Sequence, residues 1–192
     1  MKRGLDLALA GILVVPSGLF GAVIAVLIKR ESAGPIIFRQ VRVGRDGRPF
    51  EILKFRTMVH DADAQKADLT HGSEADGLFK IRNDPRLTPM GAFLRRSYLD
   101  ELPQLVNVLR GDMSLVGPRP LIPSEDAAIK GSGRERLRVP PGMTGEWQLL
   151  GGGASLDEMI AVDYRYVAEW SLWRDVCCLV HTAIRVVARK GW

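Results

Sequence analysis

The most apolar stretch of the chain lies near its N-terminus. Residues 7–28 carry no charge, and about 20 such residues in a helix are long enough to cross a bilayer. A secretory signal has a shorter apolar core, of about 7–15 residues, followed by an Ala-x-Ala cleavage pattern. This segment shows neither feature. We therefore expect a membrane-embedded helix over residues 1–30 that stays on the protein.

Two features indicate that this helix enters the membrane and turns back. One Lys-Arg pair precedes the apolar segment and another follows it, and both residue types favour the cytoplasmic side. In the middle, Pro16 removes a backbone donor and permits a sharp bend. Proline alone does not exclude a straight span, because spanning helices tolerate it. With the cytoplasmic signal at both ends, we predict a re-entrant helix-break-helix, its break at Pro16 and Ser17.

Alternating apolar and polar positions predict a β-hairpin within residues 35–58. Its two strands are expected to meet at Asp46-Gly47, a strong signal for a tight turn. Residues 60–77 are polar and poor in apolar side chains, which predicts a helix-and-loop segment of uncertain order.

Helical spacing of apolar residues predicts the remaining elements. Asp100 is expected to cap a helix that Gly111 follows. Ser155 and Glu158 form a capping box, and Ser171 is expected to cap the last helix. The predicted helices cover residues 91–99, 100–111, 155–170 and 171–190. We therefore expect an α+β protein, in which one small, mostly helical cytosolic domain over residues 31–192 follows the membrane helix.

The last predicted helix combines apolar and aromatic positions with basic residues near its end. This pattern suits a core helix or an amphipathic helix at a membrane interface. The net charge of +5 suits nucleic acid, an anionic membrane or a phosphorylated substrate, and the apolar segment favours the membrane over nucleic acid. The adjacent Cys177 and Cys178 are expected to be reduced, as in a cytosolic-facing domain.

The stretch SYLDELPQ places two carboxylates, Asp100 and Glu101, at the predicted start of a helix. Unpaired N–H groups and the helix dipole stabilise a carboxylate there and can bind a phosphate. Adjacent helical residues diverge by about 100°, so the two groups can serve different partners. The simpler interpretation, that both only stabilise the helix start, stays open.

Arginines gather around this pair in the sequence. Arg95 lies just upstream, Arg86 follows Asp84-Pro85, and Arg119 stands between Pro118 and Pro120. Arginines held stiffly suit bidentate phosphate recognition, although a solvated basic face would show the same composition.

Other kinds of site have weaker support. His60, His71 and His181 lack metal-ligand spacing, and no nucleotide-binding glycine motif is present. The run of residues 151–153 is a flexible turn or, less favoured, a phosphate cradle. If the protein is an enzyme, its nucleophile is most plausibly a carboxylate.

Taken together, these motifs resemble those of the small monotopic phosphoglycosyl transferases of bacteria. The resemblance covers nearly the whole chain and rests on KRGLD, GPIIFRQVRVGRDGRPFEILKFRTM, LFKIRNDPRLTPMGAFLRR, LDELPQLVNVLRGDMSLVGPRPL, PPGMTG and DYRYVAEWSLWRDV. It implies transfer of a sugar 1-phosphate from a UDP-sugar to undecaprenyl phosphate, with release of UMP. The implied location is the bacterial cytoplasmic (inner) membrane, with the active site on the cytosolic face.

The resemblance also implies roles for individual residues. Asp100 matches the nucleophile of a ping-pong mechanism, Glu101 its partner in proton handling or metal support, and a Mg²⁺ ion is expected near Asp100. The residues expected to contact substrate or shape its site are Arg95, Arg119, Pro118, Arg86 and Asp163. The sugar, the pathway and the oligomeric state are left open.

This chain departs from the family pattern in two places. Residues 151–153 are all glycine where many members carry an Arg, and Pro16-Ser17 replaces a Ser-Pro order. Two other classes of function stay open: a membrane-anchored basic module without enzymatic activity, and a Mg²⁺-dependent hydrolase of nucleotide sugars or lipid diphosphates.

Overall fold

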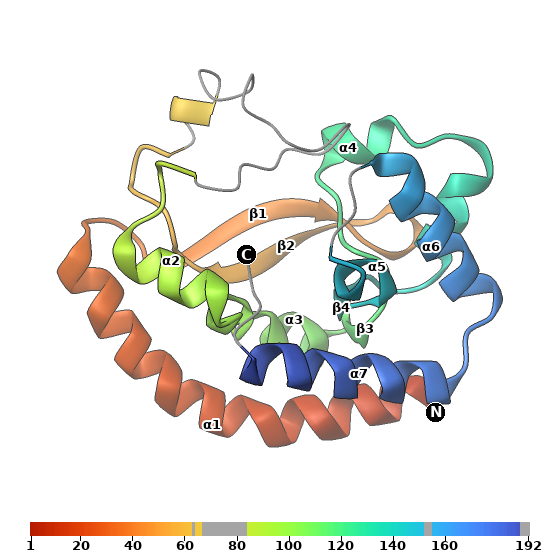
Figure 1. The fold of residues 1–192 in the computed structure, drawn as a ribbon, viewed down its shortest axis with the longest axis horizontal. Coiled ribbons are helices and arrows are strands. Elements are labelled where there is room, and N and C mark those ends of the chain that lie inside the picture. Colours follow the sequence, from red (N-terminus) through yellow and green to blue (C-terminus); the bar gives the residue numbers. More distant parts are fainter. Residues whose placement is uncertain (63, 67–83, 152–154, 189–192) are drawn as a thin grey trace.

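The N-terminal helix α1 (Lys2–Glu31) curves along one side of the protein (Figure 1). The computed structural model describes residues 1–62, 64–66, 84–151 and 155–188. The helix is not interrupted at Pro16 and Ser17, where we expected a break, and it curves instead. The physical reason is that one proline removes a single hydrogen bond of the helical ladder. The hydrogen bonds of the flanking turns are sufficient to keep the helix continuous.

Both ends of α1 are attached to the same domain. At the start, Lys2 Nζ donates to Asp175 at 2.7 Å, and Asp6 accepts hydrogen bonds from Ser114 Oγ and from the backbone N–H of Leu115. At the end, Ile24 and Ile28 are buried in one cluster with Phe55 and Leu94. Arg56 also donates to the carbonyls of Ser32 and Ala33, just past the helix. The helix therefore lies along the domain and does not project from it.

The predicted β-hairpin is confirmed. Strand β1 (Ile37–Val43) pairs antiparallel with β2 (Pro49–Phe55) through a turn at Arg45–Gly47. Asp46 and Gly47 have φ angles of 57° and 75°, and Asp and Gly tolerate this left-handed region better than most residues. Two strands that the pattern missed, β3 (Ser114–Val116) and β4 (Gly142–Thr144), form a parallel pair. They are too short to show alternation.

The segment around the carboxylate pair differs from the prediction in detail. Helix α2 (Pro89–Arg96) is capped by Thr88, and α3 (Gln104–Arg110) ends at Gly111 as expected. Asp100 does not cap α3: it lies inside a 3₁₀ turn, η4 (Leu99–Glu101), and Pro103 occupies the cap position. Because Pro103 already has helical backbone angles, the chain enters α3 through this turn.

The two C-terminal helices begin as predicted. Ser155 caps α6 (Leu156–Ala168), and Ser171 caps α7 (Leu172–Val187). Cys177 and Cys178 are free thiols. The predicted excursion over residues 60–77 and the glycine run at 151–153 lie largely outside the described residues. The shorter elements are η2 (Ala64–Lys66), α4 (Pro123–Ala127), η5 (Gly131–Arg138) and α5 (Glu146–Leu149).

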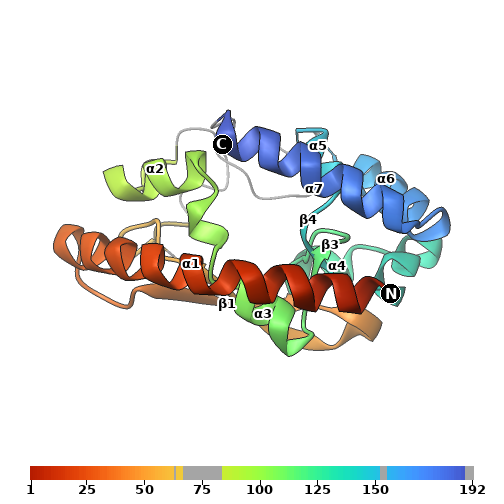
Figure 2. The same ribbon diagram turned by 90° about the horizontal axis from the view of Figure 1, so that it is seen from below.

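Helices α1 and α7 both expose apolar side chains. Both run along the lower side of the molecule in Figure 1 and are seen together from below in Figure 2. Within the described residues, α1 is the one helix long and apolar enough to cross a membrane. On α7, Asp175 and Cys178 face the interior. The large apolar side chains exposed on these two helices include Ile12, Val15, Leu19, Phe20, Val23, Trp173, Val180, Ile184 and Val187.

A close backbone contact places α2. A Cβ atom at Gly91 would lie 1.8 Å from the carbonyl oxygen of Thr57, so any side chain there must move one of the two segments. We predict that Gly91→Ala lowers the free energy of unfolding by about 1–3 kcal/mol through this overpacking. The matched control is Gly4→Ala, because a Cβ atom on Gly4 would meet no atom of another segment within 4 Å. Thermal unfolding in detergent measures both, and equal stability of the two variants would contradict the prediction.

Candidate active site

The centre of the site is the carboxylate of Asp100. The turn η4 holds it in the interior, where only 6% of the residue is exposed. The preceding Tyr98 has a left-handed backbone with a φ of 59°, uncommon for a bulky residue and typical of backbone held by its surroundings. Within the described residues, Asp100 forms no ion pair of its own.

Burial without an ion pair changes the chemistry of this carboxyl group. The pKa of Asp100 is raised from 3.8 to about 6, chiefly by burial. Of the neighbouring charges, Lys54 lowers this pKa, Glu101 raises it and Arg95 lowers it. Asp100 is therefore more basic than an ordinary carboxylate and yet largely ionised near neutral pH, a combination that suits a nucleophile.

Glu101, the second carboxylate of the pair, has a fixed partner. Lys54 of β2 donates to Glu101 Oε1 at 2.6 Å, and both side chains are about three-quarters buried. The sequence analysis did not single out Lys54. A signal existed, because Lys54 lies on the same strand face as the buried Ile52.

Arg95 approaches the pair from the last turn of α2. Its Nε donates to Thr57 Oγ1 at 3.1 Å, and it forms no ion pair within the described residues. The carboxylates of Asp100 and Asp84 both act electrostatically on Arg95. Its guanidinium is thus held near Asp100 and can still bind an added anion.

Pro118 and Arg119 follow strand β3. The Pro118 carbonyl accepts from the N–H of Gly142 at 2.9 Å, which continues the β3–β4 pairing. The Arg119 guanidinium lies over the ring of Trp147, 5.8 Å from its centroid, within the range of a cation–π contact.

Two of the predicted substrate residues lie in buried ion pairs. Arg86 binds Asp84 at 2.6 Å and also donates to the carbonyl of Ala62. Asp163 accepts from Arg136 Nε at 3.0 Å, and burial raises the pKa of Asp163 to about 6 against the opposing charge of Arg136. Arg136 donates in turn to the carbonyl of Arg119. Asp163 therefore positions Arg119 indirectly, through Arg136.

The residues present fit a Mg²⁺ ion that is coordinated partly by the protein and partly by substrate and water. No group of three His, Cys, Asp or Glu side chains converges within the described part of the chain, so a complete protein cage is not available there. Mg²⁺ usually takes one or two protein carboxylates together with substrate phosphates and water. The adjacent Asp100 and Glu101 match that requirement.

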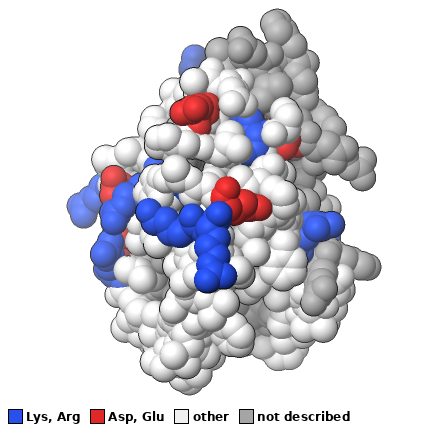
Figure 3. Space-filling model, turned by 90° about the vertical axis from the view of Figure 1, so that its left-hand side faces the viewer, with Lys and Arg blue, Asp and Glu red and all other residues white. Residues whose placement is uncertain are grey.

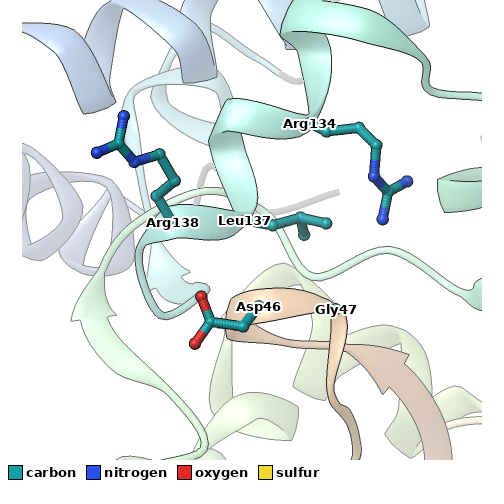
Figure 4. A pocket seen from close by; sticks show the side chains of 5 residues that line it. All are labelled: Asp46, Gly47, Arg134, Leu137 and Arg138. Carbon is teal, nitrogen blue, oxygen red and sulfur yellow. The ribbon is translucent and has the colours of Figure 1, made fainter.

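A hollow of about 250 Å³ lies elsewhere, between the hairpin turn and η5 (Figure 4). Its lining residues are Asp46, Gly47, Arg134, Leu137 and Arg138. Arg134 and Arg138 point to opposite sides and do not converge, and they pair with Asp126 and Glu135. Lys54 lies toward the opposite end of β2 from this turn. The hollow is therefore separate from the Lys54–Glu101 pair, and we place the candidate site at Asp100.

Comparison with known proteins identifies the family of this chain. The family model described as bacterial sugar transferase matches residues 1–189, and the chain belongs to this family. It is 43% identical to a galactosyl transferase, CpsE, of Streptococcus agalactiae, over 99% of this chain and 43% of that protein. It is 37% identical to the exopolysaccharide production protein ExoY of Rhizobium meliloti, over 99% of this chain and 87% of that protein.

A third relative carries a more explicit name. The chain is 42% identical to a UDP-glucose:undecaprenyl-phosphate glucose-1-phosphate transferase of Caulobacter vibrioides, over 94% of this chain and 67% of that protein. Several relatives are much longer, and the chain spans 43% and 41% of the length of two of them.

The raised pKa of Asp100 predicts a pH-dependent cost to stability. Between about pH 4 and 6 the native carboxyl keeps a proton that the unfolded chain loses, so the native protein loses stability as the pH rises. Asp100→Asn cannot ionise, and we expect it to be more stable than the parent above pH 6, by on the order of 3 kcal/mol, with no gain below pH 4.

Chemical denaturation in detergent across this pH range measures the difference. The control is Asp46→Asn, because Asp46 is exposed and Asn tolerates its left-handed backbone. A stability gain for Asp100→Asn that is the same at pH 4 and pH 8 would contradict the assigned pKa.

Proposed function

We propose that this protein transfers a sugar 1-phosphate from a UDP-sugar to undecaprenyl phosphate, as the first membrane step in the synthesis of a glycoconjugate. The observation that carries the proposal is the buried Asp100 carboxylate beside Arg95 and the Lys54–Glu101 pair. Family membership and the names of the relatives support the same reaction class.

The first half of the reaction uses Asp100 as nucleophile. One carboxylate oxygen attacks the β-phosphorus of the UDP-sugar, and the bond from that phosphorus to the bridging oxygen breaks. UMP leaves with the bond electrons, and the sugar phosphate stays on Asp100 as an acyl phosphate. The positive charge of Arg95 stabilises the negative charge on the phosphoryl oxygens in the transition state.

The second half regenerates the enzyme. An oxygen of the undecaprenyl phosphate attacks the same phosphorus, the acyl phosphate bond breaks, and Asp100 returns to a free carboxylate. The product is undecaprenyl diphosphate sugar. A Mg²⁺ ion held by Asp100 and Glu101 would neutralise phosphate charge. Lys54 holds the Glu101 carboxylate through their ion pair of 2.6 Å.

The acceptor lipid requires a membrane, and α1 suggests how the protein meets it. The helix is about 45 Å long at 1.5 Å per residue, yet Lys2 and Ile28 near its two ends both contact the domain. Its exposed apolar middle would dip into the bilayer and return, as a re-entrant segment on the cytosolic face of the inner membrane. A groove of about 440 Å³ between α1 and α2 offers apolar contacts for the lipid chain at Leu27, Met90 and Phe93, and Arg30 and Glu31 also line it.

The charge distribution fits this orientation. Figure 3 views the end of the molecule where α1 finishes and shows Lys and Arg side chains in a band across it, with a few acidic ones beside them. The surface below the band, on the side of α1, is uncharged. Basic residues above an apolar surface suit anionic lipid headgroups at a cytoplasmic membrane face.

A UMP-release assay tests the function. The full chain in detergent, with Mg²⁺ and a panel of UDP-sugars, should release at most one UMP per protein without acceptor and turn over steadily with undecaprenyl phosphate. A sugar carrying a radiolabel should remain on the parent protein and not on Asp100→Asn. The control Asp46→Asn should behave as the parent.

Each alternative gives a different result in this assay. A hydrolase releases UMP or sugar phosphate continuously without acceptor, and a basic module without enzymatic activity releases none. Full UMP release by Asp100→Asn would show that the nucleophile is another group.

Cysteine labelling tests the re-entrant topology. In a variant with Cys177 and Cys178 replaced by Ala, we place a cysteine at Gly4 or at Arg45, which are exposed on α1 and on the hairpin turn. Both should resist a membrane-impermeant maleimide in intact cells and react in inside-out vesicles. A straight span would put the two positions on opposite sides, so labelling of Gly4→Cys alone in intact cells would overturn the proposal.

A further inference from the structure

Four buried polar side-chain atoms in one region lack hydrogen-bond partners among the residues that the structure describes. The Nε of Arg42, the Nε of Arg119, Nε1 of Trp147 and Oε1 of Gln148 are all buried and form no hydrogen bond within the described residues. A buried polar atom without a partner costs about 1–3 kcal/mol. Four of them in one region are expensive for the protein alone, and this pattern is typical of a site built for a ligand.

The atoms gather around the segment Gly117–Pro120. Arg42 reaches it from β1, because its Nη1 donates to the Pro120 carbonyl at 3.0 Å. Trp147 meets it through the Arg119 guanidinium over its ring. Gln148 also lies close to this segment. A Cβ atom placed on Gly145 would be 2.8 Å from Gln148 Oε1 and 2.2 Å from the Gly117 carbonyl oxygen.

The Nη1 and Nη2 atoms of Arg42 have hydrogen-bond partners, whereas its Nε–H has none among the described residues. Its Nη2 donates to Gln40 Oε1 at 2.6 Å, and only 15% of its side chain is exposed. The nearest carboxylate, on Glu125, lies 4.0 Å away, beyond hydrogen-bond distance. Arg42 was not among the residues that the sequence analysis selected.

The guanidiniums of Arg42 and Arg119 lie close enough to repel each other. The pKa of Arg42 is lowered to about 10, first by burial and then by the charge of Arg119. Glu125 and Glu101 raise it only in part. An anion between Arg42 and Arg119 would relieve this repulsion and satisfy both Nε donors. Because Glu101 acts electrostatically on Arg42, such an anion would lie near the carboxylate pair.

Gln148 indicates which anion fits. Gln148 Oε1 is an acceptor without a partner among the described residues, and it would accept a hydrogen bond from an O–H or N–H of a phosphate-bearing ligand. A nucleoside monophosphate has ribose hydroxyls and, in uridine, a base N–H. A polyprenyl phosphate has an apolar chain in that place and offers no such donor.

We propose that Arg42 and Arg119 hold the phosphate of the nucleotide leaving group, while Gln148 accepts a hydrogen bond from its nucleoside and Trp147 donates one to the same ligand. The inference rests on the proposed function for the identity of the nucleotide. It assigns to Arg42, Trp147 and Gln148 a binding role in releasing UMP from the donor. The buried Arg136–Asp163 pair keeps Arg119 in position through its carbonyl.

Calorimetric binding of UMP and of uridine to the full chain in detergent tests this without turnover. We expect the parent to bind UMP more tightly than uridine. Arg42→Met should weaken UMP by about 10–100-fold, the loss expected for charge-assisted hydrogen bonds, and should leave uridine nearly unchanged. The matched control is Arg39→Met on the same strand, because Arg39 is exposed and, in the part of the chain that the structure describes, pairs only with Glu51. Its UMP affinity should equal that of the parent.

The ratio of UMP to uridine affinity separates binding from folding. A merely structural loss at Arg42 would weaken both ligands alike, and that result would overturn the proposal. Arg42→Lys, which keeps the charge but loses the planar fork, provides a second variant and should show an intermediate ratio. An unchanged ratio in both variants would also overturn it.

A lipid arm distinguishes the other source of phosphate. Farnesyl phosphate, a short soluble prenyl phosphate, should bind Arg42→Met as it binds the parent. If Arg42→Met weakens farnesyl phosphate and not UMP, the subsite belongs to the lipid and our assignment is wrong. Failure of the proposed function would show instead as no label on Asp100 and no transfer, a result obtained in a separate assay.

Discussion

Burial of the Asp100 carboxylate without an ion pair is the constraint on which the site depends. Within the described residues the nearby cations already have other contacts: Lys54 binds Glu101 and Arg95 binds Thr57. These cations lower the pKa of Asp100 enough for it to ionise near neutral pH, and they leave its oxygens without an ion-pair partner among the described residues. The turn η4 and the left-handed Tyr98 maintain this arrangement, and strand β2 and helix α2 supply the charges.

A second constraint concerns the position of the site relative to the lipid. The first turns of α1 bind β3 and α7 through Lys2 and Asp6, and its last turns pack on β2 and α2. The elements that carry Lys54 and Arg95 are thus the ones that hold the apolar helix. Under the proposed function, this shared support sets the depth of Asp100 relative to the membrane surface.

The arginines divide into two groups by their partners. Arg86 and Arg136 are buried against Asp84 and Asp163. Arg95 and Arg42 interact electrostatically with the carboxylate pair, and Arg119 interacts with Arg42. None of the three has an acid within hydrogen-bond distance in the described part of the chain. The first group can be satisfied by the protein, whereas the second has donors left for phosphate. Composition alone could not separate them, because the same residue type serves both purposes.

Local chemistry in the sequence determined the N-terminal helix, the Asp46-Gly47 hairpin, the caps Ser155 and Ser171 and the end of α3 at Gly111. Each depends on residues a few positions apart, so each can be read without a fold. The Asp100–Glu101 pair could also be selected from its motif. Only the tertiary structure decided that Asp100 lies inside a turn, that Lys54 faces Glu101, and that Asp163 supports Arg119 through Arg136. These contacts join residues 17 to 47 positions apart, and their energies depend on burial, which the order of residues along the chain does not specify.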